Sequence, residues 1–396
     1  MHPPRRILVA FHLPEALRDV LLGITRYSTQ NHRNWQILCV NSDEFAATYG
    51  SLRADGAIVQ TKPESRGMIQ KLRRSTMPTV NLLRDLTPHL PSVLSDNIAI
   101  GRAGATYLRG LGFKKLAFVS LDTTWSRDRQ RGFTQALLEA GLPEPVTTES
   151  LGVRDFRFIS QARAMKMMGR WAASIGPRAA VMAPSDFVAR TLLNACRARE
   201  IDVPKDLAIL GVDNFLPFCE VWPLPLSSIA QDFARMGFEA ARLLDSQMSS
   251  RKRSQAQAVL VPPGRIHVRA STDVLAFDDP LIAQAMRLIH ENAAGISIDE
   301  LLTRIPLSRR WLDQRFKLAI GHTPSEEIRK RRLRIARDLL LETDLPLRQI
   351  ARQCNFSFPE NLTRAFRAEY GLPPHAWRMK HRGIPSQPAL GSVGAE

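Results

Sequence analysis

The chain has 396 residues, of which 44% are hydrophobic and 7% aromatic, as in ordinary soluble globular proteins. This length is too great for a single core, so two or three domains are expected. The 55 basic and 38 acidic residues give a net charge of +17, which favours a polyanionic partner, and no apolar run is long enough to span a bilayer.

The first predicted element is a β-strand at residues 7–11. Two arginines precede an apolar stretch here, as they do in a signal peptide, but the stretch covers only Ile7 to Leu13. Pro14 follows it, and no small-residue cleavage site appears. We therefore expect a strand rather than a secretion signal, and a protein that stays in the cytoplasm.

Short β-like runs alternate with helical segments over residues 1–272, which form the first predicted domain. Amphipathic segments such as residues 131–141, where Gly141 is the expected C-cap, lie between the strands. This alternation predicts an α/β fold with parallel sheets covered by helices on both faces. The predicted strands are residues 7–11, 36–40, 56–60, 115–120, 179–183 and 207–213.

The strand pattern disappears after residue 280. Residues 273–280 form a predicted linker, in which Asp279 and Pro280 begin a helix, and every later segment is helical. Residues 281–380 hold 18 Lys or Arg and 11 Asp or Glu, so their net charge of +7 is about twice as dense as the +10 of the first 280 residues. We expect a basic, all-α domain over 281–380 and a disordered tail over 381–396.

The helical region repeats itself once. QRFKLAIGHTP at 314–324 matches RAFRAEYGLPP at 364–374, at an offset of 50 residues. Each copy has a leucine and a phenylalanine four residues apart, which places both on the buried side of a helix whose opposite side is polar. The pairs are Leu312 with Phe316 and Leu362 with Phe366.

Helix-capping signals join the two copies. Thr323 and Glu326 form a capping-box sequence that begins a connecting helix, which runs to about Glu342. Ser357 and Glu360 form a second such sequence before the second copy. The connecting helix would be about 27 Å long. Two helix–turn–helix units on such a rod could place their second helices in successive major grooves, about 34 Å apart.

Residues 281–380 resemble the AraC/XylS-type DNA-binding domain, an all-α double helix–turn–helix fold, whose second half is carried here by IARQCNFSFPENLTRAFRAEYGLPPHAWR at 350–378. The resemblance implies base-facing residues in both second helices. We expect DNA contacts from these residues and their polar neighbours, which are Arg309, Arg310, Asp313, Gln314, Glu360, Asn361, Thr363 and Arg364.

Two turns and one basic run qualify the DNA-binding prediction. The family usually has glycine in turns that need a positive φ, which Asn355 tolerates in the second turn. Pro306 fills the first turn and cannot adopt that conformation, so this turn must have another geometry. The run RKRRLRIAR at 329–337 is expected to be partly a solvated face and partly to contact or attract phosphate.

Several fragments of the first 275 residues resemble the two-lobed, periplasmic-binding-protein-like effector domain of LacI/GalR regulators. They are residues 95–120, 127–141, 183–186, 203–214 and 226–244. That fold binds a small molecule in a cleft between its lobes. Arg18 is one candidate for this cleft, and Trp125, Phe11 or Phe215 is expected to cover the apolar face of a sugar. By motif, the resemblance implies five further cleft residues, Asp96, Arg129, Ser185, Asp213 and Gln231.

These residue types suit a sugar, because carboxylates and a guanidinium make charge-assisted hydrogen bonds to adjacent hydroxyls. The same residues also fit structural roles, with Asp213 at a turn, Arg129 in a surface ion pair and Asp96 at the start of a helix. The order of the two domains resembles regulators of xylose use, which implies a small, xylose-like effector.

The sequence contains no motif for metal or cofactor chemistry. The nine histidines form no HExxH cluster, and the glycines of residues 101–112 lack both the P-loop and the dinucleotide spacing. We therefore expect reduced thiols, no metal site and no cofactor. The four cysteines without paired spacing are Cys39, Cys196, Cys219 and Cys354.

We predict a sequence-specific transcription regulator, a cytoplasmic homodimer that binds double-stranded operator DNA under the control of a small sugar. RNA polymerase is a candidate further partner. Two alternatives stay open. One is an enzyme fused to an AraC-type domain, such as a DNA-alkyl-transfer regulator, which needs a reactive cysteine in an accessible electropositive setting. The other is a sugar-binding protein whose C-terminal region binds only protein.

Overall fold

The computed structural model describes residues 3–11, 13–41, 45, 53–61, 66–83, 89–148, 160–220, 224–249, 258–292 and 294–381. The chain divides into two compact units, one of Met1–Thr106 with Lys115–Asp273 and one of Tyr107–Lys114 with Val274–Glu396. Across the described ranges, no helix has both the length and the apolar character needed to cross a membrane. From residue 382 onward, the predicted tail lies outside the described residues.

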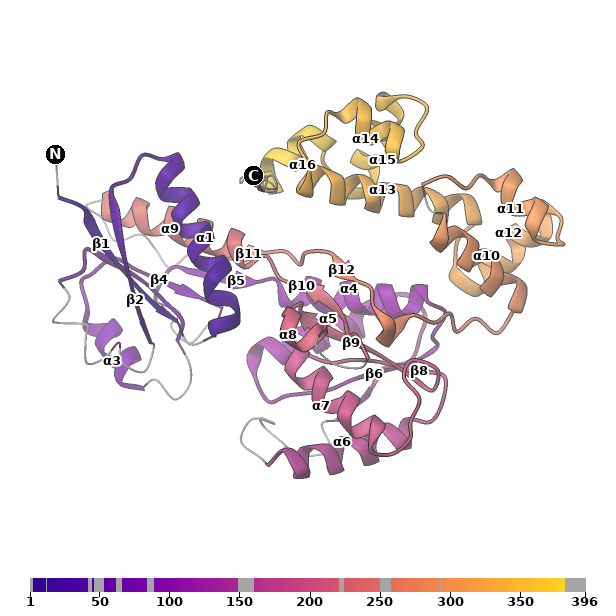
Figure 1. Cartoon of the computed structure of the whole chain (residues 1–396), viewed down its shortest axis with the longest axis horizontal. Helices are drawn as coiled ribbons and strands as arrows, with labels where there is room; N and C mark the ends of the chain where they lie inside the picture. The colour runs from indigo at the N-terminus through magenta and orange to yellow at the C-terminus, as the bar shows by residue number, and fades with distance from the viewer. Residues whose placement is uncertain are drawn as a thin grey trace, which may run out of the picture. The chain divides into compact units, whose positions relative to one another are not determined.

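Among its described residues, the first unit contains two six-stranded sheets (Figure 1). The first sheet has the order β11–β5–β4–β3–β1–β2, and all of its neighbouring strands are parallel. Its strands are β1 (Arg5–Phe11), β2 (Trp35–Asn41), β3 (Gly56–Val59), β4 (Thr79–Leu82), β5 (Ser92–Ser95) and β11 (Ala258–Val261).

The second sheet has the order β12–β10–β9–β8–β6–β7 and is also parallel, except that the short β12 runs antiparallel to β10. Two parallel sheets confirm the α/β prediction for this region. Its strands are β6 (Lys115–Phe118), β7 (Val146–Thr147), β8 (Ala179–Met182), β9 (Leu207–Asp213), β10 (Ser227–Ala230) and β12 (Ile266–His267).

All six predicted strands are present, as β1, β2, β3, β6, β8 and β9. The remaining strands were not predicted. Each has only two to four residues, and most of them contain Ser, Thr or Asn, so only β11 among the four-residue ones is a continuous apolar run in the sequence.

Helices cover both faces of the first sheet. α1 (Pro14–Gln30) and α9 (Phe233–Ser249) pack on one face, in a core shared with β1, β3, β4 and β5. α3 (Arg66–Arg74) packs on the other face, where Met68 and Leu72 meet Leu8 of β1. The alternation of side chains along β1 separates these two cores.

The second sheet is covered in the same way. α6 (Gln161–Ile175) and α7 (Asp186–Arg197) pack on one face. α4 (Asn97–Gly110) and α5 (Thr124–Glu139) pack on the other, where the rings of Phe133 and Phe118 lie 5.6 Å apart. The C-cap of α5 is Ala140, and the predicted cap Gly141 follows it with a φ of +73°.

The chain passes from one sheet to the other at three described segments. β5 of the first sheet leads to α4 on the second, β10 of the second leads to α9 on the first, and β11 of the first leads to β12 of the second. The two sheets are therefore two lobes of one unit, connected by short segments that all leave from strand ends.

Paired glycines set the closest helix approach in each lobe. A Cβ added at Gly101 of α4 would lie 1.9 Å from the carbonyl oxygen of Arg129 in α5, and one at Gly132 of α5 would lie 2.1 Å from that of Ile98. Gly23 of α1 and the facing residues of α9 show the same approach in the other lobe. In both pairs the two helix backbones are in direct contact, which only glycine allows.

The described part of the second unit is helical between its turns, as predicted. The side chain of Asp279 accepts a hydrogen bond from the backbone N–H of Leu281 at 3.0 Å, so Asp279 and Pro280 begin the first helix as predicted. The helices are α10 (Pro280–Glu291), α11 (Ile298–Arg304), α12 (Arg309–Ile320), α13 (Pro324–Glu342), α14 (Leu347–Gln353), α15 (Pro359–Tyr370) and α16 (Pro374–His381).

One of the two predicted capping boxes is confirmed. Thr323 and Glu326 cap α13, which runs to Glu342 as predicted. The box at Ser357 is wrong, because the N-cap of α15 is Phe358 and its side chain makes no capping hydrogen bond. Pro359 explains the difference, since proline occupies the first helical position and holds the residue before it in an extended conformation.

Gly101→Ala is expected to lower the free energy of unfolding by about 1–3 kcal/mol or more, because its Cβ would press against backbone that no rotamer change can move. Urea unfolding followed by circular dichroism measures the change. Gly110→Ala, in the same helix, is the control, since no heavy atom lies within 4 Å of its added Cβ. It should be neutral or stabilising by up to about 1 kcal/mol. Equal losses in the two variants would contradict the close approach.

Candidate ligand cleft and nucleic-acid interface

A cavity of about 240 Å³ opens between the two lobes of the first unit. Four of its polar residues lie at or just after the carboxyl ends of parallel strands, where ligands of α/β folds bind. Gln60 follows β3, Ser95 ends β5, Asp213 ends β9 and Gln231 follows β10. The described lining residues are Leu13, Glu15, Gln60, Leu83, Ser95, Asn97, Leu121, Trp125, Arg129, Ser185, Phe187, Val188, Asp213, Phe215, Phe218 and Gln231.

Arg129 lies at the centre of this cavity and is only 4% exposed. Its Nε donates to the side-chain oxygen of Asn97 at 2.9 Å, and an Nη donates to the carbonyl oxygen of Pro184. The guanidinium forms an ion pair with Asp213 at 3.9 Å and lies over the ring of Trp125, 5.0 Å from its centroid. Burial lowers the pKa of Arg129, and the charges of Asp213 and Asp186 oppose that shift.

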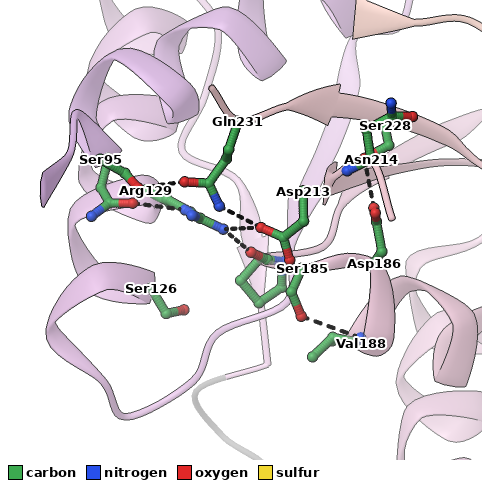
Figure 2. A network of polar contacts seen from close by, with 12 residues as sticks. Ser95, Ser126, Arg129, Ser185, Asp186, Val188, Asp213, Asn214, Ser228 and Gln231 are labelled. Carbon is green, nitrogen blue, oxygen red and sulfur yellow. Dashed lines mark hydrogen bonds and ion pairs between the residues drawn. The ribbon is translucent and has the colours of Figure 1, made fainter. Parts of the chain in front are cut away.

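A chain of hydrogen bonds connects the two lobes through Gln231 (Figure 2). The hydroxyl of Ser95, in the first sheet, donates to the side-chain carbonyl of Gln231. The amide of Gln231 donates to Asp213 of the second sheet at 2.5 Å. Because Asp213 also pairs with Arg129, a ligand that reaches these groups contacts both lobes at once.

Asp186 holds the turn that carries Asp213 into the cavity. Its carboxylate accepts hydrogen bonds from the Ser228 hydroxyl at 2.6 Å and from the backbone N–H of Phe215 at 2.9 Å. The N–H of Asn214 donates in turn to the Ser228 hydroxyl at 3.0 Å. Asp213 and Asn214 have φ of 114° and 56°, a backbone that needs such support.

Burial raises the pKa of both carboxyl groups. The pKa of Asp186 is raised to about 8, first by burial and then by the neighbouring charge of Asp213. The pKa of Asp213 is raised to about 6 by burial, while Arg129 and the hydrogen bond from Gln231 act against the shift. Near neutral pH, Asp186 is therefore mostly protonated, whereas Asp213 is mostly ionised and can pair with the buried cation of Arg129.

The cavity also offers rigid apolar surface. Phe215 stacks on Phe233 with ring planes 9° apart and centroids separated by 5.6 Å. Phe187 meets Phe218 edge to face at 6.2 Å. Aromatic faces next to convergent hydrogen-bonding groups fit a small molecule with hydroxyl groups on one side and C–H groups on the other.

The structure brings most of the predicted cleft residues together. Arg129, Ser185, Asp213, Gln231 and Trp125 all line the cavity, and so does the alternative aromatic residue Phe215. The hydroxyl of Ser185 is partly engaged, because it accepts a hydrogen bond from the N–H of Val188 at 3.4 Å as the N-cap of α7.

Three candidates lie elsewhere among the described residues. Asp96 accepts a hydrogen bond from the N–H of Ala99 at 2.9 Å, which is the helix-start role left open for it. Arg18 is exposed on α1, and Phe11 packs in the core of the first lobe.

Sequence reasoning missed several lining residues. Gln60 ends a predicted strand, so its position at a carboxyl end was a usable signal. Asn97 directly follows the chosen Asp96, and only the hydrogen bond to Arg129 shows which of the two points inward. Glu15, Ser95, Phe187 and Phe218 gave no comparable signal in the sequence.

The second unit presents two matching helices, α12 and α15, which we call the reading helices. Their residues are buried, half-buried or exposed in the same order at every position but the first. Leu312 and Phe316 anchor the first and Leu362 and Phe366 the second, each at most 1% exposed. Both helices end at a glycine in the left-handed conformation, Gly321 and Gly371.

Most of the predicted DNA-contacting residues are exposed on the reading helices. Two are half-buried, Asp313 and Thr363, and the hydroxyl of Thr363 donates to the carbonyl of Pro359 at 2.9 Å. The exposed ones are Arg309, Arg310, Gln314, Glu360, Asn361 and Arg364.

The two turns before the reading helices differ, as predicted. Asn355 has a φ of 53°, so it occupies the left-handed region. In the first turn Ile305 is extended, with φ −115° and ψ 122°, and no positive φ is needed before Pro306. The second turn is one residue longer than the first.

The basic run at 329–337 is largely engaged inside the unit. Arg331 and Arg334 form ion pairs with the buried Glu327 at 3.7 and 3.2 Å, and Arg337 pairs with Asp338 at 2.8 Å. Burial alone would raise the pKa of Glu327, but the hydrogen bond from His322 and the arginine charges together lower it. Much of this run is therefore structural, while Arg329 remains exposed.

The thiols lack the features of a reactive cysteine. Burial raises the pKa of all four, to about 12 for Cys196 and about 11 for Cys354. A thiol with a raised pKa is a poor nucleophile. Within the described ranges, no three His, Cys, Asp or Glu side chains are placed to hold a metal ion.

Comparisons with known proteins agree with this geometry. Residues 105–272 match a periplasmic binding protein-like domain, and residues 301–380 match a helix–turn–helix domain. The xylose operon regulatory protein of Haemophilus influenzae is 28% identical over 375 residues, which cover 91% of this chain and 95% of that protein. Its counterpart in Escherichia coli is 27% identical over 387 residues, covering 94% and 96%.

A solved structure has the same two domains in the same order. The xylose-binding transcription activator xylR is 26% identical, covers 96% of this chain and 99% of its own, and has a TM-score of 0.58. The chain thus resembles AraC-type transcription regulators over almost its whole length. It combines a periplasmic-binding-protein-like domain with a helix–turn–helix domain. The transcriptional regulator CelR, at 22% identity and a TM-score of 0.53, shares the fold of the first unit.

Asp186→Asn should flatten the pH dependence of the regulator's stability. The pKa of this carboxyl rises from 3.8 to about 8 on folding. Its stabilising contribution to the free energy of unfolding is therefore fully present below pH 3.8. That contribution is lost as the pH rises toward 8, at about 1.4 kcal/mol per pKa unit. Thermal unfolding should therefore show wild type losing more stability than the variant between about pH 4 and pH 8. The exposed Asp202→Asn is the control, and identical profiles for the two variants would contradict the assignment.

Proposed function

We propose that a small, neutral, xylose-like sugar binds in the cavity between the lobes and thereby controls how the chain binds operator DNA. The observation that carries this proposal is the network from Ser95 through Gln231 and Asp213 to Arg129, which spans both lobes. The relatives named above regulate a xylose operon, which supports a pentose as the effector.

In this proposal the charged groups bind sugar hydroxyls. Arg129 donates to one hydroxyl while Asp213 accepts from its neighbour, and Gln231 and Asn97 bind those beside them. A neutral sugar is favoured because the single cation of the network already has Asp213 as its counter-charge. Phe215, held flat by Phe233, covers the C–H face of the ring.

The proposed control is a shift between an open and a closed arrangement of the lobes. A ligand bound to both lobes favours the closed arrangement by its difference in affinity for the two states. The effector domain is assigned to residues 1–272, the linker to 273–280 and the DNA-binding domain to 281–380. We further infer that the regulator acts in the cytoplasm as a homodimer formed through the effector domains, and that it contacts RNA polymerase.

The reading helices are proposed to enter successive major grooves. Arg310 and Arg364 have the donor geometry to bind guanine, Gln314 to bind adenine, and Glu360 to accept from cytosine. The length of α13, 19 residues or about 29 Å, suits two grooves about 34 Å apart.

A thermal-shift screen of pentoses and hexoses tests the cleft. Xylose should raise the unfolding temperature of the full chain, because only a ligand of the folded state stabilises it by mass action. Arg129→Met should abolish this shift, whereas Arg127→Met should retain it. Arg127 is the matched control, since it lies in the same helix with a 63% exposed side chain. The absence of a shift with every sugar would contradict a sugar site.

Mobility shift on duplexes enriched by the wild-type chain tests DNA reading. Arg364→Ala should weaken binding by about 1–3 kcal/mol and relax the base preference at one position. Arg163→Ala removes an exposed arginine of the first unit and should leave binding unchanged.

Adding the cognate sugar should alter the affinity of the wild type. Equal affinity with and without sugar would contradict the proposed control.

A further inference from the structure

The two helix–turn–helix halves of the second unit have separate hydrophobic cores that share α13. The first core includes Ile328 of α13, and the second includes Leu333, Ala336 and Leu340. A helix fixes length well but bends gently along its axis. On its own, α13 therefore defines the distance between the halves better than their relative rotation, which depends on contacts across the junction.

Arg332 lies at this junction and binds both halves. One Nη donates to the carbonyl of Ile296 at 2.9 Å, in the loop between α10 and α11. The other Nη donates to the carbonyl of Asn355 at 3.3 Å, in the turn between α14 and α15. Ile296 is buried in the first core, and Cys354, next to Asn355, is buried in the second. The guanidinium thus connects backbone that is firmly held on each side.

Asn355 adds a second connection between the halves. Its side-chain amide donates to the carbonyl of Gly295 at 3.3 Å. The residue has a φ of 53°, a region that glycine adopts with less strain. Glycine would therefore suit the turn better but would have no amide to reach the other half.

We propose that Arg332 and Asn355 form a clasp that fixes the separation and rotation of the two reading helices, so that the chain accepts a single spacing between its two half-sites on DNA. This inference rests on the proposed reading of DNA by α12 and α15. Moving one half-site by one base pair shifts it by about 3.4 Å and turns it by about 35°. A relative movement of that size exceeds hydrogen-bonding range and would break the clasp.

The test is selection by the full-length chain from a library of randomised duplexes about four helical turns long. The readout is the distribution of separations between the two enriched half-sites. Asn355→Gly keeps the left-handed backbone and removes the amide, and Arg332→Met keeps the apolar stem and removes the guanidinium. Wild type should select one separation, whereas both variants should also select neighbouring ones.

Binding to duplexes of defined sequence measures the same effect as a change in affinity. Inserting one base pair between the half-sites should weaken wild-type binding by about tenfold or more, and Asn355→Gly binding by less than about threefold. Arg329→Met removes an exposed arginine from the same helix and should keep the single separation, even if its overall affinity falls.

The outcomes separate the clasp from the DNA-binding function. An unchanged single separation in Asn355→Gly would overturn the clasp and leave DNA reading intact, and this variant decides the question if Arg332→Met does not fold. Selection of two half-sites at variable separation by wild type would also overturn it. Failure of wild type to enrich any duplex would overturn both the proposed reading and the clasp.

Discussion

The buried ion pair between Arg129 and Asp213 is the interaction on which the ligand cleft depends. Removing a guanidinium from water is unfavourable by several kcal/mol unless new partners replace its hydration. Asn97, the Pro184 carbonyl and the face of Trp125 provide that replacement. Asp213 reaches the guanidinium from a turn with strained backbone, which hydrogen bonds to Asp186 and Ser228 hold in place. The charge at the centre of the cleft therefore needs contributions from residues far apart in the chain.

The close packing of α4 against α5 also positions residues of the ligand cleft. The carbonyl oxygen of Arg129 is the atom that a side chain at Gly101 would strike, and Asn97, which binds its guanidinium, begins the helix that carries Gly101. The crossing of α4 and α5 thus positions both partners of one hydrogen bond. This is why the glycines matter to the site although neither of them lines the cavity.

Much of the fold was predictable because long apolar runs and a clear repeat mark it in the sequence. The exact start of a helix and the direction of a side chain were harder to predict where two sequence signals compete. Pro359 moved a helix start by one residue away from Ser357, and Asn97 rather than Asp96 turned inward. The residues that support the site were beyond prediction, because the buried Asp186 acts through a turn nearly thirty residues away. The basic run of α13 looked like a surface, but Arg331 and Arg334 pair with Glu327 of the same helix. Only the folded structure shows that Arg332 donates to carbonyls outside α13.

The near-identical burial of α12 and α15 conceals a difference in their outer faces. Arg310 of the first helix has Glu360 as its counterpart, and Gln314 has Arg364. Under the proposed reading of DNA, two unlike helices in a fixed order along one chain require a DNA sequence that differs when read from its two ends. A DNA site of this kind is asymmetric, so it fixes the orientation of the bound chain. Genes on the two sides of such a site would therefore face different surfaces of the bound chain.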